Sequence, residues 1–283
     1  MSGKTAVLIT HSHPPAASEA VGIAVAAAER AGWQLIATSK ELEKHGEAAA
    51  GVRTVDSLPS TPDLCLVLGG DGSILYALRN FARTKVPVFG VNFGTVGFLA
   101  AVDRGSAEEG IARAFAGETE AIALPGLEVE IEGATLTALN DISFSRRPHD
   151  RIAELSYGIA GEEVGHVRCD GLVAATPAGS TGYNLANQGP ILAWGVKGYV
   201  VSYISPHSLT ARALVVAPKD VLGVTNAAGR DAVDVSVDGE HVGALEPGAA
   251  LEVRFADDVA RLAQLPGTSF YQRIREKFGH LAV

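Results

Sequence analysis

The pattern of apolar residues changes near Glu120, and this change limits the folds that the chain can adopt. Before it, short apolar runs of strand length alternate with segments of helical spacing. The strand-like runs are residues 6–10, 34–38, 64–68 and 86–91, and helical spacing extends over residues 18–31 and 107–116. Gly32 and Gly117 follow the two helical segments, where helices commonly end. This alternation predicts an α/β domain, a parallel sheet with flanking helices.

Beyond Gly126 the sequence predicts a succession of short strands instead. These are residues 128–132, 135–144, 153–160, 199–204, 233–237 and 251–255, with turns at Asp238-Gly239 and Pro247-Gly248. Helical spacing returns at Phe270, Ile274 and Phe278, which predicts a helix that packs one apolar stripe on the body. We therefore expect an α/β domain over residues 1–120, a predominantly antiparallel β domain over 121–267, and a C-terminal helix within 268–283.

Composition and charge exclude several classes of protein. The chain has 283 residues, of which 47% are hydrophobic and 19% charged, as in an ordinary globular protein. A net charge of −9 makes nucleic acid a poor partner, and no apolar run approaches the roughly 20 residues that span a bilayer. Cys65 and Cys169 show neither disulfide nor zinc spacing, which favours a reducing cytoplasm.

An acidic residue inside a glycine-rich turn follows the apolar run 64–68. The turn consists of Gly69, Gly70, Asp71, Gly72 and Ser73, and helical spacing resumes after it. Glycines let backbone N–H groups approach a phosphate, and the following helix N-terminus favours an anion. A carboxylate there would repel phosphate unless it binds Mg²⁺ or accepts a proton from an attacking hydroxyl. The alternative is a tight turn in which Asp71 caps the helix.

Two further segments have the composition of ligand loops. Residues 92–98, which begin with Asn92 and Phe93, follow the strand-like run 86–91, and ligands of open α/β sheets bind at such strand ends. Residues 170–184 combine small and hydroxylated side chains with Tyr183, whose flat ring suits a purine. Each segment alone is equally compatible with an ordinary loop.

Together with Asn140 and Asp141, these segments resemble the NAD kinase family in their order and spacing. The family pattern is a GGDG[T/S] loop, an N-x-G-x-x-G-F segment, an Asn-acidic pair and a D-G-…-T-P-x-G-S-T-x-Y loop. Residues 204–212 and the Asp238-Gly239 turn also match, so that the resemblance extends over residues 6–278. It implies phosphoryl transfer from ATP, or from polyphosphate in some members, to the adenosine 2′-hydroxyl of NAD. It also implies a homo-oligomer, a dimer or a tetramer.

The resemblance assigns roles to individual residues. Asp71 would be the general base, while the glycine turn would hold the donor phosphates, with which Mg²⁺ is expected. Asn140 and Asp141 would bind the acceptor nucleotide. The rest of the dinucleotide pocket would be formed by Asp170, Thr181, Gly182, Tyr183, Asn184, Leu185 and Ala186. Arg151 and Arg168 are candidates to meet its pyrophosphate or ribose, and a solvated strand-edge charge is the alternative for both.

The chain departs from the family pattern at some positions, and other classes of protein share part of the pattern. Tyr76 stands where many members carry a basic residue, which leaves the choice of donor open. Phosphofructokinase-type sugar kinases and lipid kinases also have a GGDG loop. The sugar kinases have a second acidic signature that this chain lacks, and lipid kinases would not require the loop 170–183. A non-catalytic NAD(P)-binding module would be expected to lack Asp71.

Overall fold

The computed structural model describes residues 3–11, 17–94 and 97–279, and within them the chain forms two compact units. The first unit consists of Met1–Ala123 and Ala260–Val283, and the second of Leu124–Val259. Strands β7 (Glu120–Ile131) and β18 (Ala250–Gln264) contribute residues to both units. The sequence places the boundaries near 120 and 267. Residues 95–96 of the expected ligand loop 92–98 and residues 280–283 of the expected C-terminal segment lie outside the described residues.

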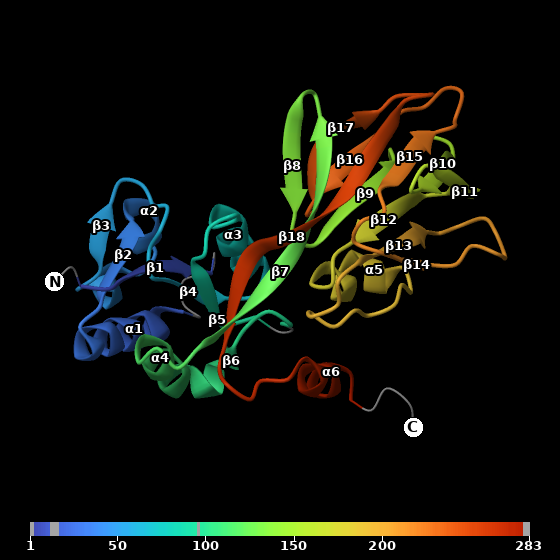
Figure 1. Ribbon diagram of the computed structural model, residues 1–283. Coiled ribbons are helices and arrows are strands. Elements are labelled where there is room, and N and C mark those ends of the chain that lie inside the picture. Colours follow the sequence, from blue (N-terminus) through green and yellow to red (C-terminus); the bar gives the residue numbers. More distant parts are fainter. Residues whose placement is uncertain (1–2, 12–16, 95–96, 280–283) are drawn as a thin grey trace. The chain divides into compact units, whose positions relative to one another are not determined.

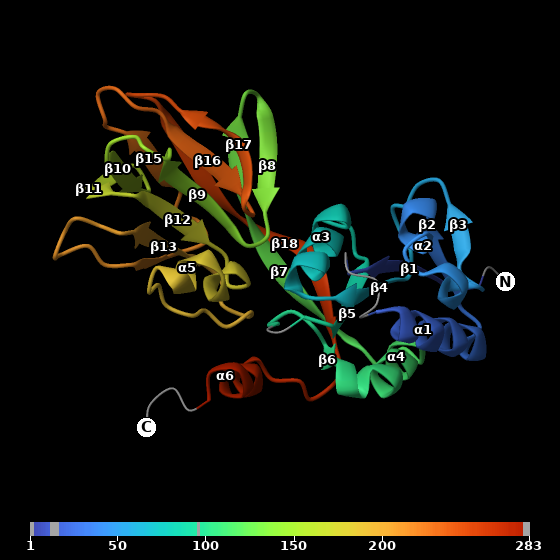
Figure 2. The same cartoon turned by 180° about the vertical axis from the view of Figure 1, so that it is seen from behind.

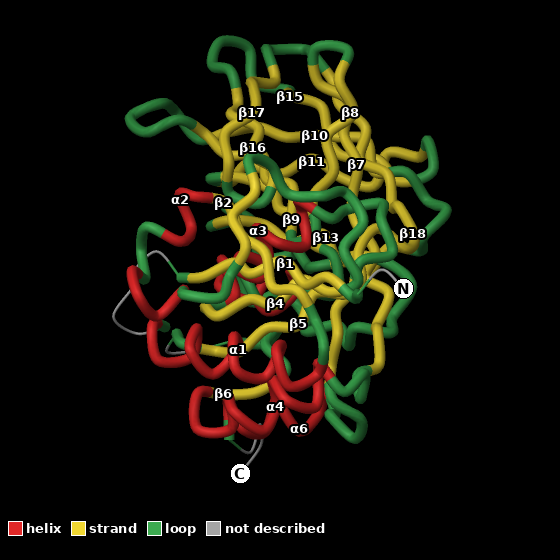
Figure 3. The backbone as a smooth tube through the Cα atoms, turned by 90° about the vertical axis from the view of Figure 1, so that its left-hand side faces the viewer, coloured by secondary structure: helices red, strands yellow, loops and turns green. Residues whose placement is uncertain are grey.

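The first unit contains a parallel sheet in the order β18-β5-β4-β1-β2-β3, and β6 pairs with β5. The strands are β1 (Thr5–Thr10), β2 (Gln34–Thr38), β3 (Arg53–Val55), β4 (Leu64–Gly69), β5 (Pro87–Asn92) and β6 (Val102–Asp103). Helices α1 (Ser18–Ala31) and α4 (Ala107–Phe115) cover one face and α3 (Asp71–Asn80) covers the other (Figures 1 and 3). Two short helical segments, α2 (Ser39–Leu42) and η2 (Gly46–Ala49), follow β2, and η3 (Arg104–Ser106) precedes α4. The predicted α/β architecture is confirmed.

Burial explains why the sequence forms these elements. Every residue of β4 is buried, as expected for a parallel strand covered on both faces. Small and branched residues form the buried stripe of α1, which ends where Gly32 adopts a φ of +72°. Strand β4 and helix α1 form one core with α4. Phe115, the last residue of α4, packs edge-on against Trp33.

The second unit contains antiparallel strands in two sheets around a common core, shown from behind in Figure 2. One sheet has the order β11-β10-β15-β18, with β7 on β18 and β8 on β7, and the other β14-β13-β12-β9-β16-β17. The strands are β8 (Ala134–Ala138), β9 (Asp141–Arg146), β10 (Ala153–Ile159), β11 (Glu162–Cys169), β12 (Gly171–Ala175), β13 (Tyr199–Ile204), β14 (Leu214–Val216), β15 (Leu222–Asn226), β16 (Val233–Val237) and β17 (Glu240–Leu245). The predicted antiparallel β character is confirmed.

Two parts of the sequence prediction differ from this unit. The single strand expected over residues 135–144 is wrong, because the chain leaves β8 at Ala138 and starts β9 at Asp141. Residues 171–175, expected to be part of a loop, form the fully buried strand β12. The loop proper is shorter and contains η4 (Gly179–Thr181) and α5 (Tyr183–Ala186).

The C-terminal helix α6 (Phe270–Phe278) belongs to the first unit. Ile274 is buried and the ring of Phe278 lies 5.5 Å from that of Phe98, as the apolar stripe predicts. The helix also buries Arg273, whose Nη2 donates to the carbonyl of Ala101 at 3.1 Å. No helix among the described residues is long and apolar enough to cross a membrane.

Candidate functional site

Asp71 is the first residue of α3, directly after the turn that leaves β4. A side chain at Gly69 would place its Cβ 2.6 Å from the Ser73 hydroxyl oxygen, so this position requires glycine. Gly70 precedes the helix in an extended conformation, and the N–H groups of Ser73 and Ile74 donate to its carbonyl. The glycine turn therefore brings Asp71 close to the carboxyl end of β4.

Two backbone N–H groups from residues 98 and 99 hold the Asp71 carboxylate. Phe98 donates to Oδ2 at 2.8 Å and Leu99 donates to Oδ1 at 3.1 Å. Burial raises the pKa of Asp71 above its ordinary value, while these hydrogen bonds and the charges of Arg273 and Lys277 oppose the rise. The carboxylate bonds to a distant segment rather than to its own helix, so the helix-cap alternative does not describe it. The result is an oriented carboxylate with an increased affinity for a proton.

Asn92 and Phe93 organise the neighbouring strand end. The Asn92 side chain donates to Asp103 Oδ1 at 2.9 Å and accepts the N–H of Gly94 at 2.9 Å. Phe93 packs against the apolar core of the unit, and the guanidinium of Arg104 lies 5.8 Å from its ring centre. Both side chains are therefore engaged within the fold, at the same sheet edge as the glycine turn.

Asp238 fixes Asn140 and Asp141 in the second unit. Its carboxylate accepts the N–H groups of Leu139 at 3.0 Å, Asn140 at 2.7 Å and Asp141 at 3.2 Å. Asp238 has a φ of +48° in the turn between β16 and β17, a conformation that Asp tolerates better than most residues. The sequence marked this position as a turn that matches the family pattern, but it could not reveal the contact, which joins residues almost a hundred positions apart.

The Asp141 carboxylate is 7% exposed and accepts no hydrogen bond from the described residues. Burial, together with the charge of Asp238, raises its pKa from 3.8 to about 7. A carboxyl with a higher pKa in the folded than in the unfolded protein stabilises the fold only while it is protonated. Its contribution is complete below pH 3.8 and is lost as the pH rises through about 7.

We therefore expect Asp141→Asn to stabilise the protein at alkaline pH. The amide stays neutral, so the gain over the parent protein should grow from pH 5 to pH 8, where it reaches on the order of 2 kcal/mol. Denaturant unfolding at several pH values measures this gain, with Glu163→Gln at an exposed position of strand β11 as the control. A difference that does not change with pH would contradict the assigned titration.

Residues 176–180 pack directly on Asn140. Thr176 donates from its N–H to the Asn140 carbonyl at 2.9 Å and from its hydroxyl to the Leu139 carbonyl at 2.6 Å. A Cβ on Gly179 would lie 2.0 Å from the same Asn140 carbonyl oxygen. The structure thus joins two of the predicted ligand segments, and Thr176 and Gly179 are positioning residues that the sequence analysis did not single out.

Asp170 forms an ion pair with Arg146, whose Nε lies 2.6 Å from Oδ1. This contact holds the pKa of the carboxyl below its usual range. Burial raises the pKa of Tyr183, and the charges of Asp141 and Asp170 raise it further, which places the phenol within the field of both carboxylates. The ring is 41% exposed. Arg146 is a further residue that the sequence analysis missed.

The remaining predicted site residues differ in what their side chains contact. Thr181 donates to the carbonyl of Ala178, and the buried amide of Asn184 donates to the carbonyls of Ser180 and Pro190. Gly182 precedes α5, which contains Leu185 and Ala186.

The two predicted arginines lie on the surface. Arg168 is exposed and pairs with Glu154 at 3.1 Å, the surface arrangement expected from the alternative interpretation. Arg151 is also exposed, and it forms no ion pair with any residue that the structure describes.

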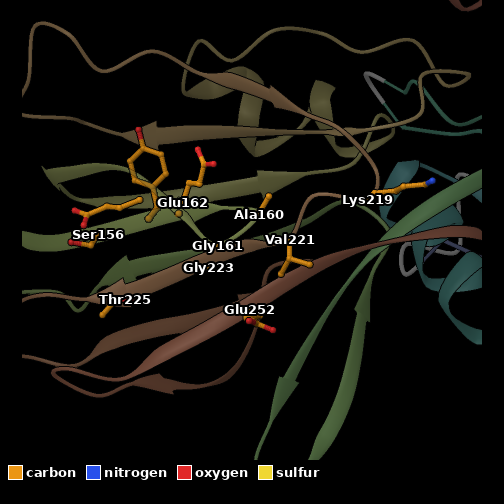
Figure 4. Close-up of a pocket in the computed structure, with 12 residues that line it drawn as sticks. Ser156, Ala160, Gly161, Glu162, Lys219, Val221, Gly223, Thr225 and Glu252 are labelled. Carbon is orange, nitrogen blue, oxygen red and sulfur yellow. The ribbon is translucent and has the colours of Figure 1, made fainter.

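A separate pocket of about 430 Å³ lies on β10, β11 and β15 (Figure 4). Its lining includes Tyr157, Glu162, Lys219 and Glu252, and none of the predicted site residues. The candidate residues lie elsewhere and are described in each unit by itself, the Asp71 turn in the first unit and the Asn140 segment in the second.

Comparison with known proteins matches both units to one family. The model of the ATP-NAD kinase N-terminal domain matches residues 21–119, and that of the ATP-NAD kinase C-terminal domain matches residues 139–265. An NAD kinase of Symbiobacterium thermophilum is 37% identical over 220 residues, which cover 76% of this chain and 78% of the relative. An NAD kinase of Burkholderia pseudomallei is 31% identical over 278 residues, covering 96% and 92%.

Two solved structures have the same fold. A yeast NADH kinase complexed with NADH superposes with a TM-score of 0.86 at 21% identity, covering 99% of this chain and 89% of that one. An NAD kinase from Archaeoglobus fulgidus in complex with ATP superposes with a TM-score of 0.70 at 23% identity, and 97% of each chain is covered.

Proposed function

This chain belongs to the NAD kinase family, and we propose that it transfers a phosphoryl group from ATP or polyphosphate to the 2′-hydroxyl of the adenosine ribose of NAD, forming NADP. The observation that carries this proposal is the oriented, partly buried carboxylate of Asp71 in the glycine turn. The family membership does not favour the sugar-kinase and lipid-kinase alternatives, and the presence of Asp71 disfavours a non-catalytic module.

Asp71 is the general base of the proposed reaction. Its carboxylate takes the proton of the 2′-hydroxyl as that oxygen attacks the terminal phosphorus, and the bond from this phosphorus to the donor's leaving oxygen breaks. The raised pKa suits this role because it increases the affinity for the transferred proton. Gly69, Gly70, Gly72 and Ser73 line the donor side in this proposal, at the N-terminus of α3, which favours an anion.

Mg²⁺ fits this site as an ion that arrives with the donor phosphates. The described residues contain no cluster of three or more His, Cys, Asp or Glu side chains that could hold a metal ion. In this proposal phosphate oxygens and water provide most of the ligands of Mg²⁺. When bound, Mg²⁺ neutralises the charge of the phosphates. Asp71 is the carboxylate of the glycine turn that would lie nearest to it.

The acceptor nucleotide binds the second unit in this proposal. Asp141 is suited to the ribose hydroxyls, because its carboxylate accepts no hydrogen bond from the described residues. Asn140 supplies an amide for the adenine edge, and the exposed ring of Tyr183 offers a stacking face. Asp170, Thr181, Gly182, Asn184, Leu185 and Ala186 complete the pocket, with Arg151 and Arg168 toward the pyrophosphate.

The test of the activity is NADP formation from NAD, Mg²⁺ and either ATP or polyphosphate by the purified chain. We expect product with at least one donor. Phosphorylation of a sugar or a lipid in place of NAD would overturn the proposal.

We expect Asp141→Ala to weaken NAD binding by about 10- to 100-fold at pH 8, where the carboxyl is ionised, since it removes a charge-assisted acceptor. Isothermal titration calorimetry with NAD measures the affinity, and Glu163→Gln serves again as the control. Unchanged affinity would move Asp141 to a purely structural role.

We also propose that the protein is a cytoplasmic homo-oligomer that associates through its β-rich unit. Leu209 and Val215, 95% and 57% exposed, are apolar residues of this unit that an interface would cover. Light scattering at micromolar concentration should give the mass of a dimer or a tetramer. A fully active monomer would contradict the proposal.

A further inference from the structure

Helix α6 places a buried cation behind the backbone segment that holds Asp71. Arg273 of this helix is 9% exposed, which is unusual for an arginine. Its Nη2 donates to the carbonyl of Ala101 at 3.1 Å and to the side-chain oxygen of Gln264 at 2.8 Å. The guanidinium thus links the C-terminal helix to strand β18 and to residues 98–101, all within the first unit.

Gln264 extends this contact to the backbone beside Asp71. Its Nε2 donates to the carbonyl of Leu99 at 3.0 Å, and the N–H of Leu99 donates to Asp71 Oδ1 at 3.1 Å. Because a guanidinium can only donate, the oxygen of the Gln264 amide must face Arg273, and the nitrogen must then face Leu99. Arg273 therefore sets the orientation of the amide that supports the Asp71 contact.

Residues 98–101 are buried and are held by several elements of the unit. The N–H of Ala101 donates to the carbonyl of Gly90 in β5 at 2.7 Å. The ring of Phe98 lies 5.5 Å from that of Phe278, the last residue of α6. With the bonds from β18 and α6, these contacts fix the segment whose N–H groups hold the carboxylate.

The charge of Arg273 also acts on Asp71. Burial lowers the pKa of this guanidinium, and the charges of Asp103, Glu276 and Asp71 oppose the fall. Burial likewise raises the pKa of Asp71, and the charges of Arg273 and Lys277 oppose that rise. Helix α6 thus favours the ionised carboxylate, the form that can accept a proton.

We propose that Arg273 is a positioning residue for the phosphoryl transfer, which holds the Asp71 carboxylate in its reactive orientation through Gln264. This inference rests on the proposed function, in which Asp71 accepts the proton of the attacking hydroxyl. Without the guanidinium, the Gln264 amide can turn its oxygen toward the Leu99 carbonyl, and two acceptors repel each other. Small displacements of a catalytic group lower turnover strongly, so the effect should appear in catalysis.

The test compares a substitution that removes the donor with one that keeps it. Arg273→Met has a long apolar side chain, and replacing a buried charge by an apolar group of similar volume is often neutral for stability. Arg273→Lys keeps a charged nitrogen, and in the parent protein one nitrogen makes both contacts. Arg275→Met, the control, makes the same chemical change at an exposed position of α6.

We expect Arg273→Met to lower kcat for NADP formation about tenfold, while KM for NAD stays within about twofold. Arg273→Lys should recover most of this loss, and Arg275→Met should have parental kinetics. Gln264→Glu is an independent variant that takes the place of Arg273→Met if the latter does not fold. Its carboxylate still accepts from Arg273 but cannot donate to Leu99, so kcat should fall in the same way.

Hydrogen exchange gives a second readout, which needs no turnover. Peptides covering residues 97–102 should exchange faster in Arg273→Met than in the parent protein and in Arg275→Met, because the bonds from Phe98 and Leu99 open more often. A parental kcat or parental exchange of this segment in folded Arg273→Met would overturn the inference, as would an equal loss of kcat in Arg275→Met. A purely structural role would lower the melting temperature and leave the kcat of the folded protein unchanged. If the parent protein makes no NADP, the proposed function is refuted, and the exchange comparison alone decides whether Arg273 holds this segment.

Discussion

Asp71→Asn is expected to lower turnover at least about 100-fold while the fold and NAD affinity are retained. The amide has nearly the same shape as the carboxylate but cannot take the proton of the attacking hydroxyl. It can still accept one of the two N–H groups that hold Asp71, from Phe98 or Leu99. The loss should therefore appear in kcat, because an unchanged acceptor site would keep KM for NAD.

Initial-rate kinetics with NAD and each donor measure this effect. Asp56→Asn, at an exposed position of the same unit, makes the same chemical change away from the turn and should have parental kinetics. Thermal melting of both variants separates a catalytic from a folding defect. Near-parental turnover in a folded Asp71→Asn variant would end the general-base assignment.

Gly179→Ala is expected to destabilise the second unit by about 3 kcal/mol and to abolish measurable NAD binding. The new methyl carbon would lie 2.0 Å from the carbonyl oxygen of Asn140, a backbone atom that cannot rotate away. Either residues 176–180 or the Asn140 segment must move. Both belong to the proposed acceptor site, so stability and affinity should be lost together.

Melting temperature and NAD titration test this expectation, and about 3 kcal/mol corresponds to a decrease of roughly 6 to 12 °C. Gly195→Ala is the matched control, because a Cβ there has no atom within 4 Å. A Gly179→Ala protein with parental melting and NAD affinity would show that the contact is not needed.

The sequence predicted most of the first unit because its signals are local. Apolar runs and helical spacing marked β1, β4, α1 and α4 to within a residue or two, and glycines marked two helix ends. The sequence prediction failed at β12. All five residues of this strand are buried, but they adjoin a run of small and hydroxylated residues that favours a loop. The break between β8 and β9 was missed for another reason. The carboxylate of Asp238, in the distant turn between β16 and β17, accepts the N–H groups of Leu139 and Asn140 at this break.

The candidate site was predicted in the same uneven way. Asp71, Asn140 and Asp141 stand in recognisable patterns, but which predicted residues bind ligand stays a prediction. Asp238 and Arg146 act by holding other residues, through contacts that span many positions of the chain, and no local pattern signals such a role. Asn184 was predicted to bind ligand because it stands in a loop pattern. Its amide instead donates to the backbone carbonyl of Ser180, a contact within the fold that the sequence did not reveal.

The first unit is assembled from two segments that the whole second unit separates in sequence, and this has a consequence for its biosynthesis. Residues 261–263 add the strand beside β5, and Gln264 donates to the carbonyl of Leu99, next to the N–H groups that hold Asp71. These residues leave the ribosome after the whole of Leu124–Val259. Since domains fold as units during synthesis, the β-rich unit is expected to fold first on a growing chain. The support behind the Asp71 turn forms only after residues 261–264 have been synthesised, so nascent chains that end within the second unit would remain inactive.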